Sequence, residues 1–369
     1  MRLNNFWWLL IWPLLFGAIY HLYNVRRQEI PQGSEEGISI RWGWIPAIML
    51  TLPYVIWAAW RSNRYFDTGQ YQNTFNAMPT GLSNMASYVA SRPKGKGFVV
   101  FEYLIKTLIS QSDIVFFLLV AFIQMFFLVL IFRRYSEDFW LSIFFFIAST
   151  DYLSWMHNGI RQFIAVTLIF ACLPLLIQKK YIWMCLVVGI AALFHSSALV
   201  FLPFVFVVNG RAWNWRTMLY IIGIIIAVIF VDRVSDFLVT AMEDTAYEGD
   251  ISLYLNDDGT NPVRVLFYAV PTVMAFVFRK HIYHADDPLI NMCVNLSVIS
   301  TGMYVISYFT SGLLIGAIPI YFSLANYILI PWILKKAFNS RSALVLEIIF
   351  VGVYSFFFYY QCGPTWGLL

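Results

Sequence analysis

Two arginines three residues apart are the first feature of this sequence that could do chemistry. Arg61 and Arg64 follow an apolar run, and Asp67 and Tyr71 continue the segment. If the run continues as a helix, residues at i and i+3 share one face, so both guanidinium groups can bind one diphosphate without a metal. The alternative interpretation is that both arginines anchor the chain at a membrane interface, with Asp67 as a counter-ion.

Two further arginines stand at predicted helix starts. Asn158, Arg161 and Gln162 open one apolar run, and Asn261 and Arg264 open another. The free N–H groups at a helix N-terminus favour anions, so an arginine at this positive end is most simply explained by an anion that both bind. The alternative is an arginine that extends its head group toward the outer membrane surface.

Three residues are candidates for a base that takes a proton from a hydroxyl nucleophile. His195 stands in the middle of the long apolar stretch 181–208, and Asp67 and Glu102 are the carboxylates nearest the apolar surface. Each can accept a proton, and spacing leaves open which of them does so. For His195, a hydrogen bond to a backbone carbonyl within a tight turn is an equal alternative.

The composition excludes several classes of protein. Of the 369 residues, 60% are hydrophobic and 12% are charged, against about 25% charged in a soluble domain. The net charge is only +4, and the basic residues are dispersed along the chain, which argues against nucleic acid as a partner. The four cysteines form no CxxC pair, and Asp257 and Asp258 lack the spacing of a calcium loop, so neither a metal site nor a cofactor is predicted.

Apolar runs predict the elements that must position these residues. Ten runs have the length that crosses a bilayer, and an eleventh, 181–208, is long enough for one tilted span or for two short ones. The ten runs are 6–23, 43–60, 114–133, 139–155, 161–178, 217–231, 264–279, 288–308, 314–334 and 342–360.

Basic pairs decide between one crossing and two at 181–208. If this stretch turns at His195 and crosses twice, all six pairs lie on one side, as short cytoplasmic loops require. We therefore predict an all-α polytopic membrane protein with about twelve crossings, both termini outside, and His195 near the external face. The pairs are Arg26/Arg27, Arg133/Arg134, Lys179/Lys180, Arg211/Arg216, Arg279/Lys280 and Lys335/Lys336.

This topology predicts one membrane domain over residues 1–369. Segment 61–113 is expected outside, with an interfacial or re-entrant helix at 98–108, where Glu102 and Lys106 interrupt an apolar run. Segment 232–263 is expected to be an acidic external loop. Nearly all candidate chemical residues then face one compartment.

Five short motifs follow one another in an order that resembles the EpsG family, Wzy-like polysaccharide polymerases of bacterial capsule, exopolysaccharide and O-antigen pathways. The resemblance covers about residues 43 to 335. The motifs are R-x2-R-x2-D-x3-Y (Arg61, Arg64, Asp67, Tyr71), a glycine and glutamate segment (Gly97 to Glu102), N-x2-R-Q (Asn158, Arg161, Gln162), F-H-x-S-A (Phe194, His195, Ser197, Ala198) and N-P-x-R (Asn261, Arg264).

The resemblance implies a metal-independent glycosyltransferase of the bacterial cytoplasmic membrane, with a GT-C-like core and an active site that faces the outside or periplasm. It would transfer a glycan from undecaprenyl diphosphate to a hydroxyl of another lipid-linked repeat unit. Flippase and chain-length regulator proteins are implied partners beside the lipid bilayer. By this resemblance Arg61, Arg64, Arg161 and Arg264 bind diphosphate, His195, Asp67 or Glu102 activates the hydroxyl, and Tyr71, Gln162 and Asn158 contact substrate.

Two other functions stay open on the sequence. A flippase or transporter for lipid-linked oligosaccharide would also place arginine in a membrane cavity, although alternating access favours polar groups through the whole bilayer depth. A transferase that moves one sugar from a polyprenyl phosphate is the second. The chain also departs from the resemblance at 315–322, where family members often carry R-I-x-x-Y-F and this sequence has no arginine.

Overall fold

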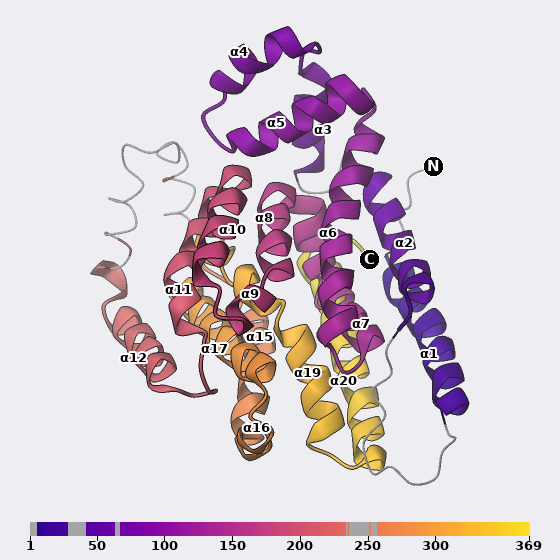
Figure 1. Ribbon diagram of the computed structural model, residues 1–369, viewed down its shortest axis with the longest axis vertical. Coiled ribbons are helices and arrows are strands. Elements are labelled where there is room, and N and C mark those ends of the chain that lie inside the picture. Colours follow the sequence, from indigo (N-terminus) through magenta and orange to yellow (C-terminus); the bar gives the residue numbers. More distant parts are fainter. Residues whose placement is uncertain (1–5, 29–41, 63–66, 234, 236–250, 252–256) are drawn as a thin grey trace. The chain divides into compact units, whose positions relative to one another are not determined.

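The fold is described from a computed structural model, which describes residues 6–28, 42–62, 67–233, 235, 251 and 257–369 (Figure 1). These residues form helices and connecting loops. They divide into two compact units, the first made of Met1–Ala171, Leu193–His195 and Leu334–Leu369, the second of Cys172–Ala192 and Ser196–Ile333. The single membrane domain stays a prediction, and most of the acidic segment 232–263 lies outside the described residues.

Helix α6 is the centre of the first unit. Helices α2 and α8 pack against it, while α1 and α20 pack against α7. The long apolar helices are α1 (Trp8–Gln28), α2 (Trp44–Ala59), α6 (Asp113–Tyr135), α7 (Phe139–Ala148), α8 (Ile160–Ala171) and α20 (Ser340–Tyr360). The shorter elements are α3 (Thr68–Ala77), η1 (Leu82–Asn84), α4 (Met85–Ala90), α5 (Lys96–Leu104), and the π-helices η2 (Ile105–Ile109), η3 (Tyr152–Asn158) and η6 (Gln361–Thr365).

Helix α17 is the centre of the second unit, and α9, α12, α15 and α18 contact it. Its side chains are buried around most of its circumference, and the buried set includes Asn291 and Asn295. The elements are α9 (Pro174–Ile177), α10 (Tyr181–Phe194, whose last two residues belong to the first unit), η4 (Ser196–Val200), α11 (Phe201–Val207), α12 (Trp215–Ile229), α15 (Pro262–Val277), α16 (Arg279–Ala285), α17 (Pro288–Phe309), α18 (Ile320–Ser323) and α19 (Asn326–Lys336, whose last three residues belong to the first unit).

The long stretch 181–208 turns back on itself at His195. Helix α10 ends one residue before His195, and η4 begins one residue after it. The rings of Tyr181 and Phe206, near the two ends of the stretch, lie only 5.8 Å apart, whereas one continuous helix would separate them by roughly 38 Å. The predicted hairpin at His195 is therefore confirmed.

The apolar helices agree with a multi-pass membrane protein. Within the described residues, four helices are long and apolar enough to span a bilayer, or six if two bent pairs each form one span, and five more are shorter apolar helices. The predicted span at 314–334 is not one continuous helix, because α18 begins only after Pro319, which has no N–H to donate to a preceding helical turn. Twelve crossings stay a prediction.

Buried hydrogen bonds compensate for a proline inside α1. Pro13 has no N–H, which leaves the carbonyl of Leu9 without its helical donor. The hydroxyl of Tyr54 on α2 supplies one at 2.8 Å, and Trp140 Nε1 on α7 donates to the carbonyl of Pro13 at 2.6 Å. In an apolar surrounding each unpaired carbonyl would cost several kcal/mol, so these contacts fix α1 against its neighbours.

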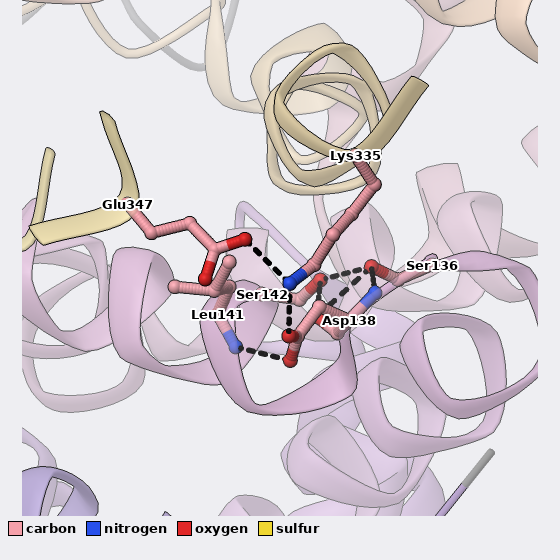
Figure 2. A network of polar contacts seen from close by, with 6 residues as sticks. All are labelled: Ser136, Asp138, Leu141, Ser142, Lys335 and Glu347. Atoms are coloured by element: carbon pink, nitrogen blue, oxygen red, sulfur yellow. Dashed lines mark hydrogen bonds and ion pairs between the residues drawn. The ribbon is translucent and has the colours of Figure 1, made fainter. Parts of the chain in front are cut away.

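A buried ion network joins α19, α7 and α20 (Figure 2). Lys335 Nζ lies between the carboxylates of Asp138, at 3.5 Å, and Glu347, with which it forms a short contact. Both carboxylates are buried, and Asp138 also accepts a hydrogen bond from Leu141 N at the start of α7. Each buried carboxylate thus lies beside a cation, which offsets the cost of removing these charges from water.

We expect Lys335→Met to lower the free energy of unfolding by about 3 kcal/mol, because it leaves two buried carboxylates without their cation. Thermal unfolding of the purified protein in detergent measures the effect. Lys336→Met is the matched control, since Lys336 is more exposed and lies 3.9 Å from a carboxylate oxygen of Glu137. Equal unfolding temperatures for the two variants would contradict the assigned role of Lys335.

Candidate active site

Arg161 is the centre of the candidate site, which lies in the first unit. It stands in the first turn of α8, directly after η3 and Gly159. Its guanidinium hydrogen-bonds Tyr71, and its charge acts on Asp67, Glu102 and His195. The structure thus brings together five predicted site residues that the sequence separates by up to 128 positions.

A compact aromatic core supports these residues. Side chains of α3, α5, η2, α6 and α8 pack together, and Tyr71 and Phe194 pack against them. Gln124 of α6 donates to the carbonyl of Ile160 at 2.9 Å, which fixes the start of α8. The core consists of Phe75, Phe98, Ile105, Phe116, Phe117, Val120, Ile160 and Ile164.

Two glycines bring the start of α5 against the turn that carries His195. A Cβ on Gly97 would lie 2.7 Å from both the Cβ and the carbonyl oxygen of Leu193, so only glycine allows this approach. Gly95 has a φ of +61°, and a Cβ there would lie 3.4 Å from Arg161 Nη1. The glycine and glutamate segment therefore positions Glu102, Arg161 and His195 relative to one another.

Glu102 is the carboxylate best suited to accept a proton. Burial raises the pKa of Glu102 to about 7, while the charges of Arg161, Arg92 and Lys106 act in the opposite direction. The side chain is only 2% exposed, and its Oε1 atom is buried without a hydrogen-bond partner. At neutral pH this carboxylate can therefore both hold and release a proton.

The other two candidate bases differ from Glu102. Burial lowers the pKa of His195 to about 4, and the charges of Arg161 and Lys94 act in the same direction, so its imidazole is neutral at pH 7. Partial burial raises the pKa of Asp67, and the charge of Arg161 acts in the opposite direction. A neutral imidazole can accept or donate a hydrogen bond without carrying charge.

Arg61 occupies a different position from Arg161. It is buried, donates to the carbonyls of Ala58 at 2.5 Å and His157 at 3.1 Å, and stacks over the ring of Phe117. These contacts tie the end of α2 to η3. Two N–H donors of Arg61 are therefore used within the protein, while its Nη2 is buried without a hydrogen-bond partner.

The remaining predicted site residues differ in where they lie. Asn158 Oδ1 accepts from Asp67 N at 3.2 Å, and Gln162 is buried in α8. Arg64 lies outside the described residues. Arg264 belongs to the second unit, where Asn261 caps α15 and the guanidinium of Arg264 lies 5.7 Å from the ring centre of Tyr268.

Three basic residues near Glu102 and His195 do not belong to any of the sequence motifs. Arg92 and Lys106 act on Glu102, and Lys94 acts on His195. Lys106 Nζ also donates to the carbonyls of Phe75 and Asn76, which holds the end of α3. The available signal was the number of basic residues in segment 61–113, which runs against the expected bias for an external segment.

Asp257, the first residue of the acidic pair at 257–258, has a structural role in the second unit. Asp257 Oδ2 accepts hydrogen bonds from Ser311 Oγ at 2.9 Å and from Leu313 N at 2.7 Å. These bonds join the segment before α15 to the turn after α17. Within the described part of the chain, no three His, Cys, Asp or Glu side chains gather as metal ligands.

Taken together, the described residues define an all-helical protein with several candidate membrane spans and an arginine and carboxylate site beside a helix start. The chain belongs to the EpsG family, whose profile matches residues 44–362. This family is associated with polysaccharide biosynthesis. Searches of curated proteins and of solved structures found no match.

Proposed function

We propose that this protein is a polysaccharide polymerase of the outer face of the bacterial cytoplasmic membrane. It transfers a glycan from undecaprenyl diphosphate to a hydroxyl of another lipid-linked repeat unit. One observation carries the proposal: Arg161 Nε and Glu102 Oε1, an electrostatically coupled pair of groups, are both buried without hydrogen-bond partners. Buried polar atoms normally have partners, so a bound substrate would complete this site.

The reaction requires a base and a cation. The acceptor hydroxyl gives its proton to Glu102, and its oxygen forms a bond to the anomeric carbon of the donor. The bond from that carbon to the diphosphate oxygen breaks, and its electron pair leaves with undecaprenyl diphosphate. Arg161 stabilises the charge that develops on the diphosphate, because fixed cations bind the transition state more strongly than the ground state.

The pKa values favour Glu102 over His195 as the base. A base is most effective when its pKa lies near the working pH, and the pKa of Glu102 is about 7, whereas that of His195 is about 4. His195 then serves as a neutral hydrogen-bond partner for a sugar hydroxyl. Tyr71 orients Arg161, and Arg61 supports the site through η3; diphosphate binding by Arg64 and Arg264 stays a prediction.

The direct test supplies the purified protein in liposomes with the undecaprenyl-diphosphate repeat unit made by its own locus. A ladder of integral repeat units on a gel supports the polymerase. Substrate that becomes protected across the liposome membrane, without any ladder, would instead identify a flippase. Addition of one sugar from a polyprenyl phosphate would identify the single-sugar transferase.

We expect Gly97→Val to lower polymer formation about tenfold, because the new side chain would push the 193–195 turn away from α5 and misplace His195. The ladder assay measures the rate. Gly189→Ala in α10 is the matched control, since no atom lies within 4 Å of its new Cβ. A Gly97→Val protein with an unchanged rate would show that this close contact does not position the site.

A further inference from the structure

Three basic segments of the second unit converge on two adjacent cavities. The first cavity has a volume of about 510 Å³ and is lined by Lys179, Arg211 and Arg216. The second has a volume of about 500 Å³ and is lined by Arg211, Arg279 and Lys280. Both belong to the face that the basic pairs predict to be cytoplasmic, and neither contains a residue of the candidate active site.

The two cavities share one wall, which is formed by Arg211, Asp286 and Asn291. Arg211 Nη2 pairs with Asp286 Oδ2 at 2.8 Å, and Asp286 is the single carboxylate among the residues that line either cavity. The other four cations are Lys179, Arg216, Arg279 and Lys280. Since one pair is already neutralised, these four leave both cavities positively charged.

The walls are held in place before any ligand binds. Asn295 Nδ2 donates to the carbonyl of Val208 at 3.0 Å, and Asn291 Oδ1 accepts from Ala212 N at 2.9 Å, so the 208–214 loop is fixed to α17. Aromatic rings hold two of the guanidinium groups: Arg279 lies 4.5 Å from the Phe276 ring centre, and Arg211 lies 5.1 Å from that of Tyr283. A preorganised cationic cavity binds anions at a low entropic cost.

An apolar surface begins at the first cavity. Trp215 lines this cavity, and Leu219, Ile222 and Ile226 follow it along α12 at the spacing of one helix face. All four side chains are exposed. This arrangement suits a molecule with an anionic head and a hydrocarbon chain, whereas a free anion would use only the cavity.

We propose that these cavities bind the phosphate headgroup of an anionic phospholipid, with an acyl chain along the exposed face of α12. Basic groups at the cytoplasmic ends of membrane helices attract such headgroups. The site is independent of the proposed reaction. It would fix the second unit in the cytoplasmic leaflet by a specific lipid.

The test measures the thermal unfolding midpoint of the full-length protein in a neutral detergent during titration with lipid. Dioleoyl phosphatidylglycerol should raise the midpoint in a saturable way, while dioleoyl phosphatidylcholine and millimolar inorganic phosphate should not, since a ligand that binds the folded state stabilises it. Lys179→Gln combined with Lys280→Gln should raise the phosphatidylglycerol concentration that gives half of the midpoint shift about thirtyfold. Neither lysine has a side-chain partner among the described residues, so folding is preserved.

Lys180→Gln is the matched control, because Lys180 adjoins Lys179 and lines neither cavity. Its response to phosphatidylglycerol should stay within twofold of the wild-type response. An equal response to phosphatidylcholine would overturn the proposal, as would a double variant that behaves like the wild type. If phosphate alone stabilised the protein as much as the anionic lipid does, the ligand would be a free anion, and the proposal would be overturned.

Discussion

Replacing Arg161 with alanine is expected to lower the rate of polymer formation by about 10³-fold while the protein stays folded. Arg161 contacts Tyr71 and faces Glu102 and His195, so its removal takes away the cation that would stabilise the leaving diphosphate. Loss of one preorganised group at a developing negative charge costs about 10²–10³-fold, and a full charge lies at the upper end of this range. The ladder assay in liposomes measures the rate.

Two variants make the Arg161 result specific. Arg161→Lys keeps the charge but cannot form two parallel hydrogen bonds to a phosphate, so we expect an intermediate rate. Arg134→Ala removes an exposed arginine at the end of α6, away from the candidate site, and should keep the wild-type rate. If Arg161→Ala polymerised at the wild-type rate, the diphosphate would have to bind elsewhere.

Replacing Glu102 with glutamine is expected to lower the rate by about 10³-fold and to change its dependence on pH. General-base catalysis contributes about 10²–10⁴-fold, and the amide has nearly the same shape but cannot take the proton. In the wild type the rate should rise about tenfold per pH unit below pH 7 and level off above it, because burial raises the pKa of Glu102 to about 7. The variant should lack this rise.

Histidine variants decide between the two bases. If His195 were the base, the wild-type rate would already be level above about pH 4, where the imidazole is neutral, and His195→Gln would abolish the reaction. With Glu102 as the base, His195→Gln should lower the rate far less than Glu102→Gln does. A wild-type profile that is flat between pH 5 and 8 would contradict the assignment of Glu102.

The ionisation of Glu102 also affects stability. We expect Glu102→Gln to lower the rate without unfolding the protein. The pKa of Glu102 is raised in the folded state, so between about pH 4.5 and 7 the folded protein holds a proton that the unfolded chain releases. The stability that this group contributes is therefore lost as the pH rises through that window. The glutamine variant should show a smaller fall in unfolding temperature from pH 5 to pH 8.

The sequence by itself determined the class of the molecule and much of its local structure. Apolar run lengths, basic pairs and short motifs are local properties, because a helix and its ends depend on residues only a few positions apart. They were enough to predict membrane helices, the hairpin at His195 and membership of the EpsG family. They also brought Glu102, Arg161 and His195 into one list of candidates.

Only the tertiary structure decided which candidates meet and what each one contacts. Arg61 and Arg161 have the same chemistry in the sequence, but Arg61 is buried against backbone carbonyls while Arg161 faces Glu102. Likewise, residues of three basic pairs that indicated only sidedness proved to line two cavities, and Lys335 proved to pair with two buried carboxylates. Such contacts join residues from tens to about two hundred positions apart, and their geometry depends on how whole helices pack rather than on any local pattern.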